Sequence, residues 1–218
     1  MRNNLHLTLS NIIKDQSNEI ISLVLEAQSF TISNLSSTTS FYICSKNIIH
    51  HSLVDFLPAR EFKNTSEITS YKKEHQTLII NIIQAIEKLK NEIKDKQIII
   101  KSAYIGGKSI ALEAYLSSDI LNFAYEIKKN IKSIGDFPKV KGFPSEKPKK
   151  FAINIIRFLR PLSTQEDQIL NERVLELTKK LQEKPIEFEL KRLSLVVSDD
   201  YLSNPDPEIT KFVLNKDS

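Results

Sequence analysis

The sequence is poor in cysteine, glycine and histidine, and each shortage excludes a kind of site. Cys44 is the single cysteine among 218 residues, so no disulfide can form within the chain, and we expect a reducing compartment. One cysteine and four scattered histidines cannot supply the closely spaced ligands of a structural zinc site. The segment IGGKS resembles part of a nucleotide-binding loop, but Ser102 stands where that motif requires its first glycine.

Long hydrophobic runs are also missing. The longest, residues 77–86, is too short to cross a bilayer and is interrupted by polar residues. Residues 1–15 lack the apolar core and the cleavage site of a signal peptide. Hydrophobic residues make up 40% of the chain and charged residues 27%, which is too apolar for a disordered protein. We therefore expect a cytoplasmic globular protein with no membrane partner.

Positive charge is unevenly distributed along the chain. Residues 128–160 hold ten lysines and arginines against Asp136 and Glu146, a net charge of +8, so the remainder carries −4 of the total of +4. A local basic segment is typical of contact with a phosphate-bearing partner such as RNA or a nucleotide. A solvated lysine-rich loop explains the same composition, and the sequence leaves both interpretations open.

Hydrophobic periodicity predicts a mixture of strands and helices. Alternation at every second residue predicts strands, and steps of three and four residues predict helices. Gly106 and Gly107, between two β-rich runs, predict a hairpin, while Ser17 and Asp119 are the expected N-caps of two helices. The predicted strands cover residues 4–12, two runs within 29–47, 48–57, the two arms of 96–116, 151–159 and two runs within 186–200. The predicted helices cover residues 17–28, 73–94, 119–131 and 166–182, and the predicted loops are 59–73 and 133–150.

A weak internal repeat organises these elements. Residues 48–116 and 151–198 both read strand, loop, helix, strand, strand. Neither unit can bury its sheet alone, so we expect two antiparallel sheets that flank a central cleft, with helices outside. The predicted fold class is α+β, in a single bilobal domain over residues 1–200 followed by a C-terminal tail over residues 201–218.

Two short stretches occupy equivalent places in the repeat. The first reads HHSL at residues 50–53, and the second reads AINIIR at residues 152–157. Over residues 1–200 this arrangement resembles the two-histidine (2H) phosphoesterase superfamily, which includes the bacterial RNA 2′,3′-cyclic phosphodiesterases also called 2′-5′ RNA ligases. Members carry a His-x-Thr/Ser-apolar motif in each lobe. The first stretch matches this motif, whereas the second keeps the arginine but has Ala152 in place of histidine and Asn154 in place of the hydroxyl residue.

The resemblance implies acid–base chemistry on a phosphodiester without a metal or cofactor. One imidazole acts as base on a hydroxyl or water, and a second protonates the leaving oxygen. The implied substrate is a 2′,3′-cyclic phosphate or 2′-5′ linkage of RNA or a small nucleotide, and the fold implied is a 2H phosphoesterase-like one. The implied catalytic residues are His50 as the surviving acid–base group, Ser52 as a donor to the phosphate, and His6 as the candidate partner imidazole.

Three further residues are candidates for substrate binding. Thr8 belongs to HLTL, residues 6–9, a stretch that also matches the motif but that we assign to the strand preceding the first lobe's motif. Asn154 has an amide that can donate to a phosphate. Arg157 lies three residues further on and points to the opposite face of the strand unless a bulge intervenes.

Because Ala152 stands where the second motif has histidine, the sequence allows both an active and an impaired phosphoesterase. Losing one imidazole is expected to cost about 100- to 10,000-fold in rate. The alternative function is therefore a catalytically impaired module that binds RNA or nucleotide through Ser52, Asn154 and the basic segment. A structural protein with no ligand in the cleft is a third alternative.

Overall fold

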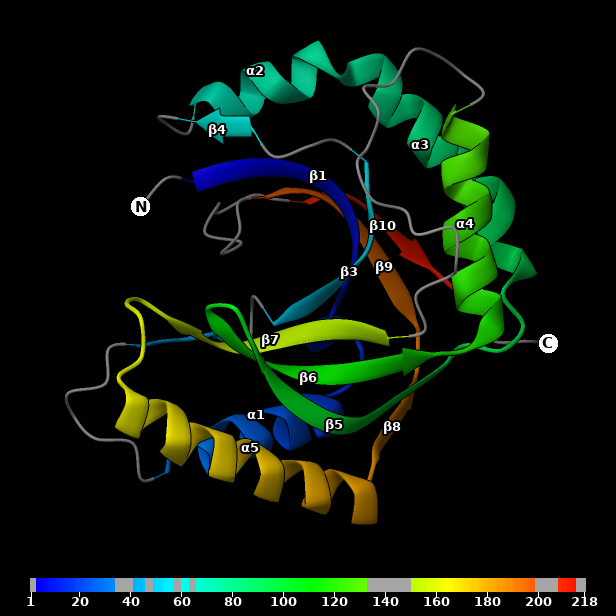
Figure 1. Ribbon diagram of the computed structural model, residues 1–218. Coiled ribbons are helices and arrows are strands. Elements are labelled where there is room, and N and C mark those ends of the chain that lie inside the picture. The colour runs from blue at the N-terminus through cyan, green and yellow to red at the C-terminus, as the bar shows by residue number, and fades with distance from the viewer. Residues whose placement is uncertain are drawn as a thin grey trace.

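Two antiparallel sheets of five strands each form the framework, and helices lie outside them (Figure 1). The computed structural model describes residues 3–33, 41–45, 49–56, 60–62, 66–132, 150–198 and 208–214. The first sheet has the order β10-β9-β1-β3, with β4 also paired to β1, and the second has the order β2-β7-β6-β5-β8. The predicted α+β class with two antiparallel sheets is confirmed.

The strands of the first sheet come from both ends of the chain. They are β1 (Asn3–Ile12), β3 (His50–Asp55), β4 (Arg60–Phe62), β9 (Arg192–Ser198) and β10 (Glu208–Val213). The second sheet is built from the middle of the chain, with β2 (Phe41–Ile43), β5 (Gln97–Gly106), β6 (Ser109–Leu116), β7 (Lys150–Phe158) and β8 (Ile186–Glu189). The two predicted motif stretches therefore lie in different sheets, on β3 and β7.

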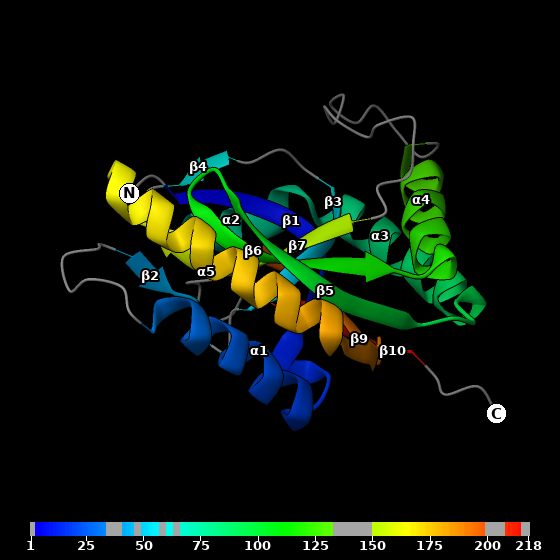
Figure 2. The same ribbon diagram turned by 60° about the horizontal axis from the view of Figure 1, so that its bottom comes forward.

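Within the described ranges, five α-helices cover these sheets. They are α1 (Asn18–Ile32), α2 (Ser66–Glu74), α3 (Gln76–Leu89), α4 (Ser118–Lys132) and α5 (Thr164–Glu183), with short 3₁₀ turns at Ile13–Asp15 and Lys90–Glu92. Helices α1 and α5 lie side by side against the second sheet (Figure 2). Helices α3 and α4 pack together beside the first sheet (Figure 1).

Local sequence signals explain where several elements begin. The hydroxyl of Ser17 accepts a hydrogen bond from the amide of Ile20 and caps α1, as predicted. At α5, Ser163 and Glu166 form a reciprocal capping box. The predicted hairpin also forms, since β5 pairs with β6 across a turn in which Gly107 has a φ of 56°, a conformation that glycine adopts without steric cost.

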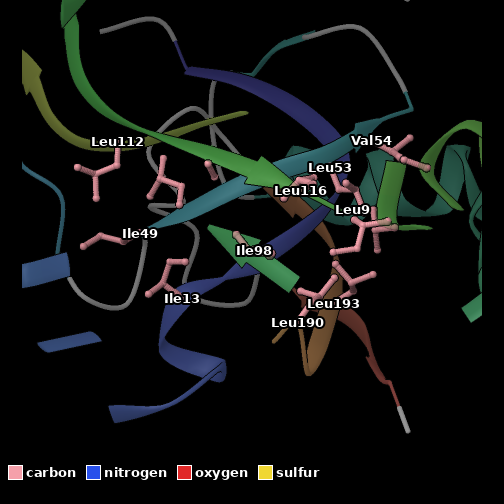
Figure 3. Packing of buried hydrophobic residues seen from close by; sticks show 14 of the residues in the cluster. Leu9, Ile13, Ile49, Leu53, Val54, Ile98, Leu112, Leu116, Leu190 and Leu193 are labelled. Atoms are coloured by element: carbon pink, nitrogen blue, oxygen red, sulfur yellow. The ribbon is translucent and has the colours of Figure 1, made fainter. Parts of the chain in front are cut away.

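One face of each sheet builds the hydrophobic core, shown from close by in Figure 3. From the first sheet it takes Leu7, Leu9, Leu193, Leu195, Val197 and Phe212, and from the second Ile98, Ile100, Ile110, Leu112, Leu116 and Ile153. Ile12 and Val196 lie apart in a small cluster of their own. The opposite faces of the two sheets are therefore left for polar side chains, and we call them the polar faces.

Four sequence-based assignments differ from the structure. Residues 29–32, expected in a strand, continue α1, where the hydroxyl of Thr31 donates to the carbonyl of Ala27 one turn earlier. The loop expected at 59–73 contains β4 and α2 instead, because β4 pairs with the start of β1. Asp119 does not cap α4. Its carboxylate accepts from the amides of Lys94 and Asp95, and the hydroxyl of Ser117 accepts from Ile120.

The fourth difference concerns the C-terminal tail. Residues 208–213 form β10 and pair antiparallel with β9. Phe212 is almost fully buried, and Leu214 beyond the strand is buried as well. Residues 208–214 are therefore part of the first sheet and its core. The basic loop predicted at 133–150 lies outside the described residues except for Lys150.

Candidate active site

The register of β3 against β1 decides which motif residues share a face. Ser52 lies opposite Ser10, and His50 lies opposite Ile12. Partners opposite each other in an antiparallel pair project to the same side of the sheet, so His50 and Ser52 lie on the polar face. His51, opposite Asn11, projects to the core side.

A bulge follows Ser52 in β3. Leu9 pairs with Val54 and the next residue, Ser10, pairs with Ser52, so Leu53 has no partner on β1. An extra residue of this kind shifts the alternation of everything beyond it by one. Asp55 lies opposite Thr8 and consequently returns to the face that carries His50 and Ser52.

The second motif strand, β7, contains a bulge at the equivalent place. Ala111 of β6 pairs with Asn154 and Ile110 pairs with Ile156, so Ile155 is the extra residue. Arg157 then lies opposite Ser109, on the same face as Asn154. The sequence predicted that Arg157 shares a face with Asn154 only if a bulge lies between them. The bulge at Ile155 meets this condition.

The two motif strands thus present the same pattern. On β3 the polar-face positions are His50, Ser52 and Asp55, and on β7 they are Ala152, Asn154 and Arg157. In each strand the unpaired residue directly follows the second of the three positions. This match extends the predicted internal repeat from the order of elements to the geometry of single residues.

Strands β3 and β7 contact each other although they belong to different sheets. On the core side the rings of His51 and Phe151 lie 5.4 Å apart, centroid to centroid. Their sequence neighbours His50 and Ala152 alternate to the polar faces. His50, Ser52, Asn154 and Arg157 are all partly buried.

One predicted site residue, Thr8, does not join this group, and the side chain of a second, His6, is not described. The side chain of Thr8 is 2% exposed, and its hydroxyl donates to the carbonyl of Val54 at 3.1 Å. Thr8 therefore ties β1 to β3, and we leave it out of the proposed site. His6 lies in β1 with its Cα opposite that of Ser198. Its side chain lies outside the described part of the structure, so its role as a partner imidazole stays a prediction.

A carboxylate that the sequence reasoning missed lies beside the altered motif. Glu113 of β6 is directly opposite Ala152 of β7. Its Oε2 accepts hydrogen bonds from the hydroxyl of Ser102 at 2.5 Å and from that of Tyr115 at 2.9 Å. Strict alternation in SIALEAYL, residues 109–116, places Ser109, Glu113 and Tyr115 on one face, and that signal was available in the sequence.

The surroundings of Glu113 are partly buried and hold further titratable groups. Burial, with the negative charge of Glu113 as a second cause, raises the pKa of Tyr104 on the neighbouring strand β5. The ammonium of Lys101 lies 4.4 Å from the centroid of the Tyr115 ring. The polar face of the second sheet therefore places phenol and hydroxyl groups around the carboxylate of Glu113.

The second histidine of the pair is a core residue. His51 is 1% exposed, and burial, with the neighbouring His50 as a second cause, lowers its pKa from 6.5 to about 3. Neither ring nitrogen has a hydrogen-bond partner among the described residues, and the same holds for the amide of Asn11 opposite it. His51 is thus a neutral imidazole remote from the polar face.

Cys44 is not a candidate nucleophile. It is buried, and burial raises the pKa of its thiol to about 11 against the opposing effect of Arg157. A thiol becomes reactive as its thiolate, so this cysteine is inert near neutral pH. Its backbone instead links β7 to α1, because its amide donates to the carbonyl of Ile155 and its carbonyl accepts from the side-chain amide of Gln28 on α1.

Other features lie elsewhere on the molecule. A groove of about 320 Å³ between α1 and α5 is lined by residues such as Phe30, Leu177 and Lys180, and contains no motif residue. Within the described ranges, no three His, Cys, Asp or Glu side chains lie together as a metal site. None of the described helices is both long and apolar enough to span a membrane.

Several solved structures have a fold similar to that of this chain. No protein-family model matches the sequence, and no curated protein matches it. TT0787 of Thermus thermophilus is 14% identical with a TM-score of 0.52, over 98% of both chains. ATU0111 of Agrobacterium tumefaciens strain C58, described as a conserved protein of unknown function, is 6% identical with a TM-score of 0.62, over 99% of this chain and 87% of that one.

A third match is LigT of E. coli complexed with phosphate, at 9% identity and a TM-score of 0.46, over 98% of this chain and 99% of LigT. TT0787 is a member of the 2H phosphoesterase family. At these identities the likeness establishes the architecture of the chain, and the predicted resemblance is confirmed at that level. The chain has the fold of the 2H phosphoesterases.

Proposed function

We propose that this protein is a phosphoesterase that acts on a 2′,3′-cyclic phosphate or a 2′-5′ phosphodiester of RNA or a small nucleotide. The observation that carries the proposal is the pair of matching motif strands. Each places its motif positions on a polar face, and each uses a bulge to add a charged residue to that face. The shared fold supports the same conclusion. RNA as the natural partner and a cytoplasmic location stay predictions.

The partly buried polar side chains divide into two roles. His50 is the acid–base group, because an imidazole can both accept and donate a proton near neutral pH. Ser52 shares its face and can donate a hydrogen bond to a phosphoryl oxygen. From the opposite strand, Asn154 offers amide hydrogens and Arg157 a guanidinium, which is suited to charge-assisted hydrogen bonds with phosphate.

The proposed reaction is hydrolysis of the cyclic ester. The oxygen of a water forms a bond to phosphorus while the bond from phosphorus to one ribose oxygen breaks. The proton that leaves the water is taken up by a basic group, and a second proton is delivered to the departing ribose oxygen. The product is a nucleoside monophosphate, or an RNA end that carries a phosphomonoester, and no oxidant or reductant is needed.

Incubation with a 2′,3′-cyclic nucleotide tests this function. We expect the wild-type protein to release a nucleoside monophosphate, observed by chromatography or by phosphorus NMR, at a rate proportional to protein concentration. A 3′,5′-cyclic nucleotide serves as the control and should remain intact, because its ring involves different ribose oxygens. A protein that binds the cyclic nucleotide and never opens its ring would contradict the proposal.

Ala152 favours a second candidate function, a binding module that holds RNA or nucleotide without efficient turnover. In that case affinity for single-stranded RNA should fall steeply with salt, because phosphate contacts release counterions. His50→Ala should then leave the affinity unchanged, and no hydrolysis should accompany binding. Filter binding at several salt concentrations, with the products analysed in parallel, distinguishes this module from the enzyme.

Arg157 provides a prediction that concerns binding alone. We expect Arg157→Ala to raise the dissociation constant for a nucleoside monophosphate roughly 10- to 100-fold, because a hydrogen bond to a charged group contributes about 1.5–3 kcal/mol. Isothermal titration calorimetry measures the change. Arg173→Ala is the matched control, since Arg173 lies on α5 and forms an ion pair with Glu176. Equal affinities for the wild type and Arg157→Ala would remove Arg157 from the site.

A further inference from the structure

The polar face of the second sheet contains a carboxylate at the place where a two-histidine enzyme has its second imidazole. Ala152 leaves only a methyl group at the motif position. Its cross-strand neighbour on the same face is Glu113, and side chains in such pairs start about 4.5–5.5 Å apart. The Glu113 carboxylate can therefore extend over the space that an imidazole at position 152 would fill.

Glutamate is uncommon in the interior of a strand, but the neighbours of Glu113 supply hydrogen bonds to its carboxylate. Strand β6 is the central strand of the second sheet, and Glu113 is partly buried there. Hydroxyls from two directions, Ser102 on β5 and Tyr115 on β6, donate to the same carboxylate oxygen. These contacts hold the carboxylate in one orientation beside Ala152, as a positioned acid–base group requires.

We propose that Glu113 is the second acid–base residue of the site and works with His50 across the two polar faces. This inference rests on the proposed phosphoesterase function and extends it. A carboxylate accepts a proton in its ionised form, so Glu113 takes the proton of the attacking water. The imidazolium of His50 delivers a proton to the departing ribose oxygen, so the two groups exchange protons with the substrate in a balanced way.

The pH–rate profile separates a catalytic from a structural role. The base must be ionised, so activity should fall on the acid side as Glu113 becomes protonated. The acid must be protonated, so activity should fall on the alkaline side as His50 loses its proton. The titratable groups around Glu113 on its own and the neighbouring strand are Tyr104 and Tyr115, and the ammonium of Lys101 lies over the Tyr115 ring. Glu113 is the carboxylate within this cluster, so the variants of Glu113 test directly whether it produces the acid limb.

The experiment measures hydrolysis of a 2′,3′-cyclic nucleotide by wild type, Glu113→Gln and Glu187→Gln across the pH range. Glutamine keeps the size of the side chain and an oxygen acceptor for Ser102 and Tyr115. We expect Glu113→Gln to lower kcat about 100- to 10,000-fold and to lose the acid limb, with KM within a few-fold of wild type. Glu187 lies on β8 in the same sheet and contacts Gln97, so its variant should match the wild type.

Two results would overturn the role of Glu113, and they are separable from failure of the function itself. A wild type that turns over substrate and a Glu113→Gln variant that keeps its rate or its acid limb would reject Glu113 alone. A wild type with no turnover would reject the enzyme and this role together. If Glu113→Gln does not fold, as judged by circular dichroism, Glu113→Asp decides. A shortened carboxylate should keep the acid limb at a kcat at least tenfold lower, and an unchanged kcat would reject the role.

Discussion

Replacing His50 by alanine should reduce hydrolysis of a 2′,3′-cyclic nucleotide about 100- to 10,000-fold, the loss expected when one acid–base group is removed. His50 is partly buried at the start of β3, so the truncation removes little core packing. Nucleotide affinity should therefore change by only a few-fold, because the phosphate contacts proposed for Asn154 and Arg157 are unaffected. Steady-state kinetics gives kcat and KM, and calorimetry gives the dissociation constant.

His75→Ala is the control for removal of an imidazole. His75 lies between α2 and α3, where its ring packs against Tyr71 with the ring centroids 4.5 Å apart, and no motif residue is near it in sequence. Its variant should retain the wild-type rate. Undiminished turnover in His50→Ala would remove the central residue of the mechanism and leave the binding module as the function to pursue.

The second large effect concerns stability in acid. In the folded protein the pKa of His51 is lowered to about 3 by burial, whereas the unfolded chain has the ordinary value of 6.5. Below pH 6.5 the imidazole of His51 therefore binds a proton in the unfolded state but stays unprotonated in the folded state. The free energy of unfolding should fall by roughly 1 kcal/mol or slightly more for each pH unit between about 6.5 and 3.

His51→Leu should remove that slope. The two nitrogens of His51 have no hydrogen-bond partner within the described part of the chain, so an apolar side chain of similar size loses no hydrogen bond there. Urea unfolding at a series of pH values should show that His51→Leu keeps much more of its neutral-pH stability at pH 5 than the wild type does. His75→Gln should follow the wild-type curve. Parallel curves for His51→Leu and wild type would show that another group causes the acid sensitivity.

Periodicity and capping signals were sufficient to predict most of the framework. The stripe on α3, the Ser17 cap, the Gly106–Gly107 hairpin and both motif strands depend on residues close together in the sequence, and they formed as expected. The missed elements depend on distant partners. Strand β4 exists because it pairs with β1, and β10 because it pairs with β9. The apolar residues of that last segment, Ile209, Phe212 and Leu214, were its one local signal.

The candidate site was only partly predictable for a related reason. The sequence identified His50, Ser52, Asn154 and Arg157 but could not locate the bulges, because an extra residue in one strand is defined only against its partner strand. Alternation places His50 and Ser52 on one face and His51 on the other, but the sequence suggested a solvent or interface position for His51, which is a core residue. Glu113 was missed because its importance comes from lying opposite Ala152, and cross-strand neighbours between β6 and β7 are far apart in the chain.

The unpaired residues Leu53 and Ile155 also change how distant relatives of this chain should be sought. Because of them, the first, third and sixth residues of a six-residue window share one face, as in HHSLVD and AINIIR. A search pattern that fixes the sixth position as charged and tolerates any small or polar residue at the first would recover copies whose histidine has been lost.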